Sequence, residues 1–203
     1  MNPRVARRII AIGVVIGLAG LALFAGLHAL VVTPVWSQLL LPIPFVVTIG
    51  VSVTWAYHEH ATVVAGRVNA RDGFRFGVMV WVAALPGTAV ANVARVRHVG
   101  ALPIWAGVLA FILAVAGGAL VLGGATRTRR SAIAGIVTAL ALLAAAAGPL
   151  PVLRNGRVAE LWFGLLILES AGGLLLALLY RRWIAPLALA AGERHFPALD
   201  GLS

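Results

Sequence analysis

Charged residues along the chain are separated by long apolar runs, the longest of which lies near the N-terminus. Residues 9–57 carry no charged side chain. A single helix of that length would extend over roughly 73 Å, whereas a hydrocarbon core of about 30 Å needs about 20 residues. The run therefore predicts two membrane-spanning helices. Thr33-Pro34 and Pro42-Ile43-Pro44 mark the turn between them, because proline lacks the N–H that a helix interior requires.

The same pattern continues to the C-terminus and predicts six membrane-spanning helices in one transmembrane domain covering residues 1–203. Prolines and arginine-rich segments, such as the basic loop expected around residues 67–75, separate the helices. The expected helices lie at residues 6–32, 44–66, 76–94, 101–124, 131–152 and 159–180. The apolar stretch in the tail 183–203 is too short to cross and is expected at the interface. The predicted fold class is an all-α integral membrane protein.

The overall composition supports this class. The chain is 62% hydrophobic and only 11% charged, against about 45–50% and about 25% in an ordinary soluble domain. So few polar groups could not cover the surface of a soluble fold with 203 residues. Composition therefore excludes a soluble enzyme, an ordinary nucleic-acid-binding domain and a disordered chain. The expected partner is the lipid bilayer, and no nucleic acid is expected.

The basic residues predict an orientation in the membrane. All 16 of them are arginine, and the formal net charge is +10. With the N-terminus inside, the inner segments hold twelve arginines and the outer loops four, a bias that follows the positive-inside rule. Both termini are therefore expected in the cytoplasm, in a bacterial-type inner (plasma) membrane. The inner arginines are Arg4, Arg7, Arg8, Arg67, Arg71, Arg75, Arg127, Arg129, Arg130, Arg181, Arg182 and Arg194.

Small residues recur on several expected helices. Gly13 and Gly17 stand four apart in helix 6–32, and Gly118 lies in helix 101–124. Small side chains let helices approach closely in lipid, where apolar side chains gain little by leaving the acyl chains. One interpretation is a face for a homo-oligomer or for other membrane subunits. The other is packing between helices of this chain.

Glu169 is the first candidate for function within an expected span. It lies ten residues into helix 159–180, which places it near the midplane at a rise of about 1.5 Å per residue. Ionisable groups in a membrane are costly and usually face the bundle interior or a cavity. Glu169 is interpreted as a proton, cation or amine site, with a neutral, hydrogen-bonded packing residue as the alternative.

A row of polar residues in helix 44–66 is the second candidate. Successive spacings of four, three, four and three place its five members on one helical face. Such a row predicts the lining of a pathway or a buried hydrogen-bond network. For Glu59, the alternative is a side chain that extends toward the inner headgroups. The five residues are Thr48, Ser52, Trp55, Glu59 and Thr62.

Three histidines are candidates for cofactor binding. His58 and His60 flank Glu59, but residues two apart on a helix point about 200° away from each other, so they cannot share one ion. No metal site is therefore predicted. His28, near the outer end of helix 6–32, could ligate haem or a pigment, with a hydrogen-bonded interfacial histidine as its alternative. The sequence leaves the identity of any cofactor open.

Catalytic signatures such as GxSxG, a P-loop or a paired HxxxH are missing. No catalytic residue is predicted, and an enzyme is not the favoured class. The chain also has no cysteine, which excludes disulfides and thiolate metal sites. We expect a transporter or channel for a small solute, proton or cation, lined by intramembrane carboxylates. The alternatives are a non-catalytic accessory or structural subunit of a larger membrane complex, and a haem- or pigment-binding redox subunit.

Overall fold

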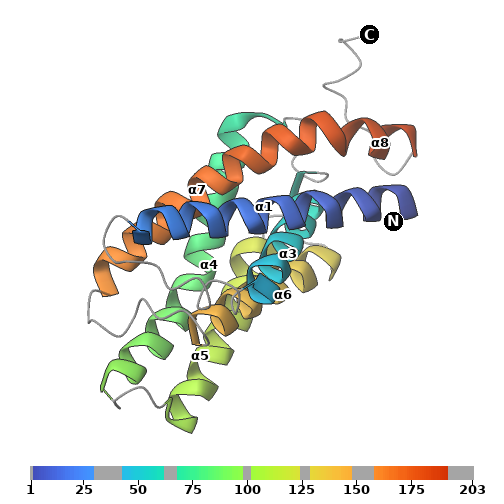
Figure 1. Ribbon diagram of the computed structural model, residues 1–203. Helices are drawn as coiled ribbons and strands as arrows, with labels where there is room; N and C mark the ends of the chain where they lie inside the picture. The colour runs from blue at the N-terminus through green and yellow to red at the C-terminus, as the bar shows by residue number, and fades with distance from the viewer. Residues whose placement is uncertain are drawn as a thin grey trace.

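The computed structural model describes residues 2–29, 43–61, 68–97, 102–123, 129–147 and 158–191. All regular secondary structure in these ranges is helical (Figure 1), which confirms the all-α prediction. The helices are α1 (Pro3–Ala29), α3 (Ile43–Ala61), α4 (Ala70–Arg97), α5 (Ile104–Gly117), the π-helical segment η1 (Gly118–Gly123), α6 (Arg129–Ala147), α7 (Val158–Trp183) and α8 (Ala185–Ala190).

Three of these helical segments are long and apolar enough to cross a membrane: Pro3–Leu23 in α1, Ala70–Ala94 in α4, and Ile104–Leu122 in α5 with η1. Only 28% of the apolar window in α1 and 22% of that in α5–η1 is buried inside the molecule. Ile104 and Leu120, for example, are 86% and 74% exposed. Apolar surface on this scale needs a covering other than water. The three helices therefore indicate a membrane protein.

Two helices, α1 and α4, begin earlier in the sequence than the charge pattern predicts, because an asparagine caps each of them. The Asn2 Oδ1 accepts a hydrogen bond from the Arg4 backbone N–H at 2.9 Å, and the Asn69 Oδ1 accepts one from the Asp72 N–H at 2.9 Å. Each side chain satisfies a backbone donor that the first helical turn leaves without a partner. As a result, Arg71 and Arg75 lie in the first turns of α4, which corrects the expected loop over residues 70–75, while Arg67 lies outside the described residues.

The expected ends of other helices differ in detail. α5 begins at Ile104, directly after Pro103, and ends at Gly117, and the six residues that follow it form the π-helical segment η1. Residues 62–66, which the sequence assigns to the second helix, lie outside the described part of the chain. In the expected interfacial tail, the six residues of α8 form a helix whose Ala185 and Ala188 are buried against the bundle.

Glycines hold α1 against α3. Gly13 and Gly17 of α1 lie against the α3 backbone at Val51 and Val46, and Gly50 of α3 lies against both glycines. A Cβ at any of the three would overlap backbone atoms of the facing helix. The order of these contacts shows that the two helices are antiparallel. The glycines identified in the sequence therefore serve packing within this chain.

Two further pairs of antiparallel helices also approach closely at glycines. Gly73 and Gly77 of α4 face Gly173 and the Glu169 carbonyl of α7. Gly118 of η1 faces Gly135 of α6, so this glycine too lies between helices of the same chain. Close backbone approach of this kind is the usual basis of helix association in lipid.

One hydrophobic cluster joins α1, α3, α4, η1, α6, α7 and α8 near one end of the bundle. It includes Val5 of α1, Tyr57 of α3, Phe76 of α4, Ala134 of α6 and Tyr180 of α7. The starts of α1, α4 and α6 therefore lie at the same end as the last turns of α3 and α7. Because the helices alternate in direction, residues far apart in the sequence meet here.

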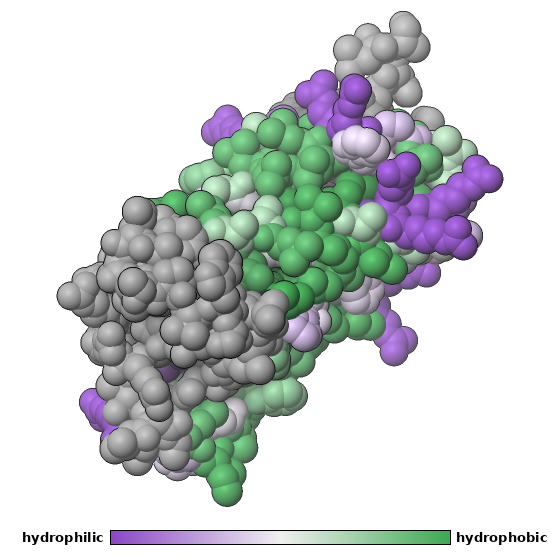
Figure 2. All heavy atoms as spheres, viewed as in Figure 1, coloured by the Kyte–Doolittle hydropathy of each residue, from purple (hydrophilic) through white to green (hydrophobic). Residues whose placement is uncertain are grey.

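This end, which we name the basic end, carries nine of the ten arginines whose side chains the structure describes, and all nine are exposed. Figure 2 shows hydrophilic side chains gathered where α1 begins and α7 ends, with an apolar surface beside them. Arg97, the tenth, lies exposed at the far end of α4. The nine arginines are Arg4, Arg7, Arg8, Arg71, Arg75, Arg129, Arg130, Arg181 and Arg182.

The glycine contact between α1 and α3 predicts a stability difference between two Gly→Ala variants. Gly50→Ala is expected to lower the free energy of unfolding by about 1–3 kcal/mol, because its Cβ meets the α1 backbone. Gly20→Ala is the matched control, since a Cβ there meets no atom within 4 Å. The control should be neutral or stabilising by about 0.5–1 kcal/mol. Unfolding by SDS in mixed micelles measures both. Equal effects of the two substitutions would contradict this packing.

Candidate functional site

The polar face of α3 turns away from α1. Gly50, which touches α1, and Thr48 differ by about 200° around the helix, and α3 packs on α6 as well as on α1. Along this face Thr48 is exposed, Trp55 is partly buried, and Ser52 and Glu59 are only 4% and 3% exposed. Thr62, the fifth predicted member, lies outside the described residues. Thr48 is thus the exposed end of the face, and Ser52 and Glu59 are its buried members.

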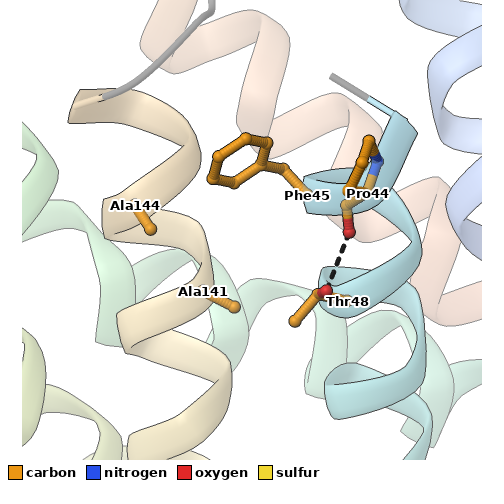
Figure 3. A pocket seen from close by; sticks show the side chains of 5 residues that line it. All are labelled: Pro44, Phe45, Thr48, Ala141 and Ala144. Carbon is orange, nitrogen blue, oxygen red and sulfur yellow. Dashed lines mark hydrogen bonds between the residues drawn. The ribbon is translucent and has the colours of Figure 1, made fainter. Parts of the chain in front are cut away.

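A pocket of about 240 Å³ opens between α3 and α6 at the Thr48 end of this face. Pro44, Phe45 and Thr48 line it from α3, and Ala141 and Ala144 line it from α6. In Figure 3 the Thr48 side chain points toward α6, and the Phe45 ring lies across the gap between the two helices. The volume is below the range of about 300–1,000 Å³ usual for drug-sized ligands, so it suits water or a small solute.

The hydroxyl groups of the polar face bond to their own helix. The Thr48 hydroxyl donates to the Pro44 carbonyl at 2.7 Å (Figure 3), and the Ser52 hydroxyl donates to the Ile49 carbonyl at 2.9 Å. A hydroxyl has one proton to donate but two lone pairs. With each proton directed at the backbone, the oxygens offer acceptor sites. Such a face suits cations and hydrogen-bond donors better than anions.

Glu59 ends the polar face as a buried carboxyl group at the basic end. Ser131 lies in the first turn of α6 at the same end and is 3% exposed. Burial of a charged or polar side chain is unfavourable unless polar groups of the protein surround it. Among the described residues of this face, Glu59 is the one that combines burial with an ionisable side chain.

The two candidate histidines of α3 face different helices. The His58 Nδ1 lies 2.9 Å from the Tyr180 hydroxyl of α7, in a buried hydrogen bond. The His60 ring packs on Phe76 of α4, with ring centroids 5.3 Å apart. Within the described part of the chain, no group of three or more acidic or histidine residues could hold a metal ion. His28 lies in α1, but its side chain is outside the described residues.

Aromatic contacts around His58 were not predicted from the sequence. The Tyr57 ring meets Phe76 and Tyr180 edge-on, with centroids 5.0 and 5.2 Å apart. Together with His58, these rings connect α3, α4 and α7 at the basic end. The only sequence signal was the position of each aromatic residue close to a helix end, which does not say which rings meet.

Two further groups of polar atoms are buried away from the polar face of α3. Asn92 of α4 is fully buried, and neither of its amide atoms has a hydrogen-bond partner among the described residues. The His60 Nδ1 and the Asp72 Oδ2 are likewise buried and without a hydrogen bond in the described part of the molecule. Neither group adjoins the pocket lining.

Glu169 belongs to another part of the bundle. Its carbonyl lies against Gly77 at the α4–α7 contact, and its side chain is partly buried. It precedes Tyr180 by eleven residues, which is roughly 16 Å along α7. Glu59 is the neighbour of His58, which contacts Tyr180. The two carboxyl groups therefore lie at different depths and on helices with different packing partners.

Comparison with protein-family models, with curated proteins and with solved structures finds no match to this chain. The geometry of the site is therefore the basis for its proposed function. That geometry combines a small pocket, a row of hydroxyl oxygens and a buried carboxyl group on one helical face.

The bond between His58 and Tyr180 predicts a measurable coupling. Tyr180→Phe removes the hydroxyl and is expected to lower the free energy of unfolding by about 1–3 kcal/mol, because a buried ring nitrogen loses a partner. In a His58→Ala background the same substitution should cost about 1 kcal/mol less. A double-mutant cycle on SDS-induced unfolding measures the difference. Additive effects of the two substitutions would show that this hydrogen bond contributes nothing.

Proposed function

We propose that the chain is a multi-pass transporter or channel that moves a proton, a small cation or a small hydrogen-bond-donating solute along the polar face of α3. The observation that carries the proposal is the position of Glu59. It is 3% exposed and ends a polar face whose other end, at Thr48, lines the pocket between α3 and α6. Ser52 and Trp55 lie between these two points on the same face.

The proposed path depends on six membrane crossings. α3, α6 and α7 would cross in addition to the three long apolar helices, and the basic end would face the cytoplasm of a bacterial-type inner membrane. The nine exposed arginines at that end support the orientation, because arginine is retained on the cytoplasmic side. The pocket would then face the outside, and Glu59 would lie toward the inner surface.

Glu169 would act separately from this face. Its depth, roughly 16 Å from Tyr180 along α7, supports a position near the midplane of the proposed membrane. We retain it as a proton or cation site on the α4–α7 side of the bundle. An ionisable group at that depth is a functional candidate because its burial in lipid is costly.

An accessory or structural subunit of a larger membrane complex is the second candidate. It is favoured by α5 and η1, of whose apolar window only 22% is buried inside the molecule. Gly13, Gly17 and Gly118 are already in contact with helices of this chain. A homo-oligomer or another subunit would therefore bind a different surface, such as the exposed side of α5 around Trp105 and Phe111.

Glu59→Gln tests the transport proposal. Removal of the titratable group is expected to lower flux by about tenfold or more, which corresponds to about 1.4 kcal/mol in the barrier. Purified protein in liposomes is assayed with an entrapped pH-sensitive dye for protons, and separately with sodium and potassium gradients.

Thr54→Ala is the matched control in the same liposomes. Thr54 is a buried hydroxyl residue of α3 that bonds to the Gly50 carbonyl at 2.7 Å, about 140° around the helix from Glu59. Loss of the Thr54 hydroxyl should leave the ion flux unchanged. Flux that is equal in the wild type, in Glu59→Gln and in empty liposomes would refute transport of the ions assayed.

A further inference from the structure

The ends of α1 and α7 place several arginines around one exposed tryptophan. The Arg8 guanidinium lies 5.3 Å from the centroid of the Trp183 ring, which is 49% exposed. Arg7, which directly precedes Arg8, and Arg4, one turn earlier in α1, are also exposed, as are Arg181 and Arg182 just before Trp183. Because α1 contacts both α7 and α8, these side chains belong to one surface. We name these six residues the arginine–tryptophan surface.

The charge of this surface is not balanced by exposed acids in the described part of the molecule. Glu59 is buried, and Asp72 and Glu169 are partly buried. Five guanidinium groups therefore face outward together. A surface with this excess of positive charge is complementary to an anion.

An apolar strip continues from the arginines along each helix. On α1, Val15 and Leu18 are 54% and 43% exposed and stand on the same side as Arg4 and Arg8 by helical spacing. On α7, Leu178 is 53% exposed and lies one turn before Arg181. Positive groups at the top of an exposed apolar strip match a molecule with an anionic head and hydrocarbon tails. A soluble anion would leave these apolar strips uncovered.

We propose that the arginine–tryptophan surface is a binding site for an anionic phospholipid. The phosphate group lies among the guanidinium groups of Arg4, Arg8 and Arg182. The Trp183 ring lies at the level of the ester groups, where its amphipathic ring is well placed. The acyl chains follow the apolar strips of α1 and α7. This binding does not depend on the transport proposal, because none of these residues belongs to the polar face of α3.

Lipid retention by the intact protein tests the proposal. The wild type is delipidated in mild detergent, and native mass spectrometry then measures binding of phosphatidylglycerol and of phosphatidylcholine. We expect preference for phosphatidylglycerol, and a loss of about 25-fold in its affinity in the Arg4→Gln/Arg8→Gln variant, at about fivefold per arginine. Arg97→Gln is the matched control, since it removes an exposed arginine at the opposite end. The affinity of the Arg97→Gln variant for phosphatidylglycerol should change less than about twofold.

A fluorescence measurement locates the bound lipid. Phosphatidylglycerol with brominated acyl chains quenches nearby indole rings, and the quenched signal should fall in Trp183→Phe but not in Trp105→Phe on α5. The proposal would be overturned if Arg97→Gln lost as much affinity for phosphatidylglycerol as Arg4→Gln/Arg8→Gln. It would also be overturned if the wild type retained phosphatidylcholine as well as phosphatidylglycerol, or if both tryptophan variants were quenched equally. Equal stabilisation of the protein by inorganic phosphate and by phosphatidylglycerol would also overturn the proposal. So would an acidic polypeptide that stays bound to the protein and that phosphatidylglycerol does not displace.

Discussion

The close approach of helix backbones at glycine is the constraint on which the rest of this structure depends. In a membrane, apolar side chains gain little free energy by moving from lipid to protein, so helices need close contact to associate. Gly13, Gly17 and Gly50 provide that contact between α1 and α3, and Gly73, Gly77 and Gly173 provide it between α4 and α7. These contacts determine which sides of each helix are left for other functions.

The candidate site follows from this packing. Because Gly50 directs one side of α3 onto α1, the polar face of α3 is directed away from α1. Thr48 then reaches the pocket beside α6, while Glu59 becomes buried at the basic end. The α4–α7 contact places the end of α7 so that Tyr180 meets His58, which connects α3 to that pair.

The sequence predicted which parts of the chain are helical and which residues share a face of α3, because both depend on local spacing. It also predicted that His58 and His60 point apart, and they contact α7 and α4 respectively. Helix pairing could not be predicted, since glycines occur on most of the helices and each fits several partners. The bond between His58 and Tyr180 joins residues 122 positions apart, and no local pattern encodes it.

The central claim is that the polar face of α3 is accessible to water between the pocket and Glu59. The chain contains no cysteine, so single cysteines can be introduced and tested one at a time with a small hydrophilic thiol reagent in intact membranes. We expect Thr48→Cys to react readily and Ser52→Cys to react more slowly, because Ser52 is only 4% exposed, whereas Thr54→Cys, at a fully buried position on another side of α3, should not react. Reaction at Thr54→Cys but not at Ser52→Cys would contradict this expectation.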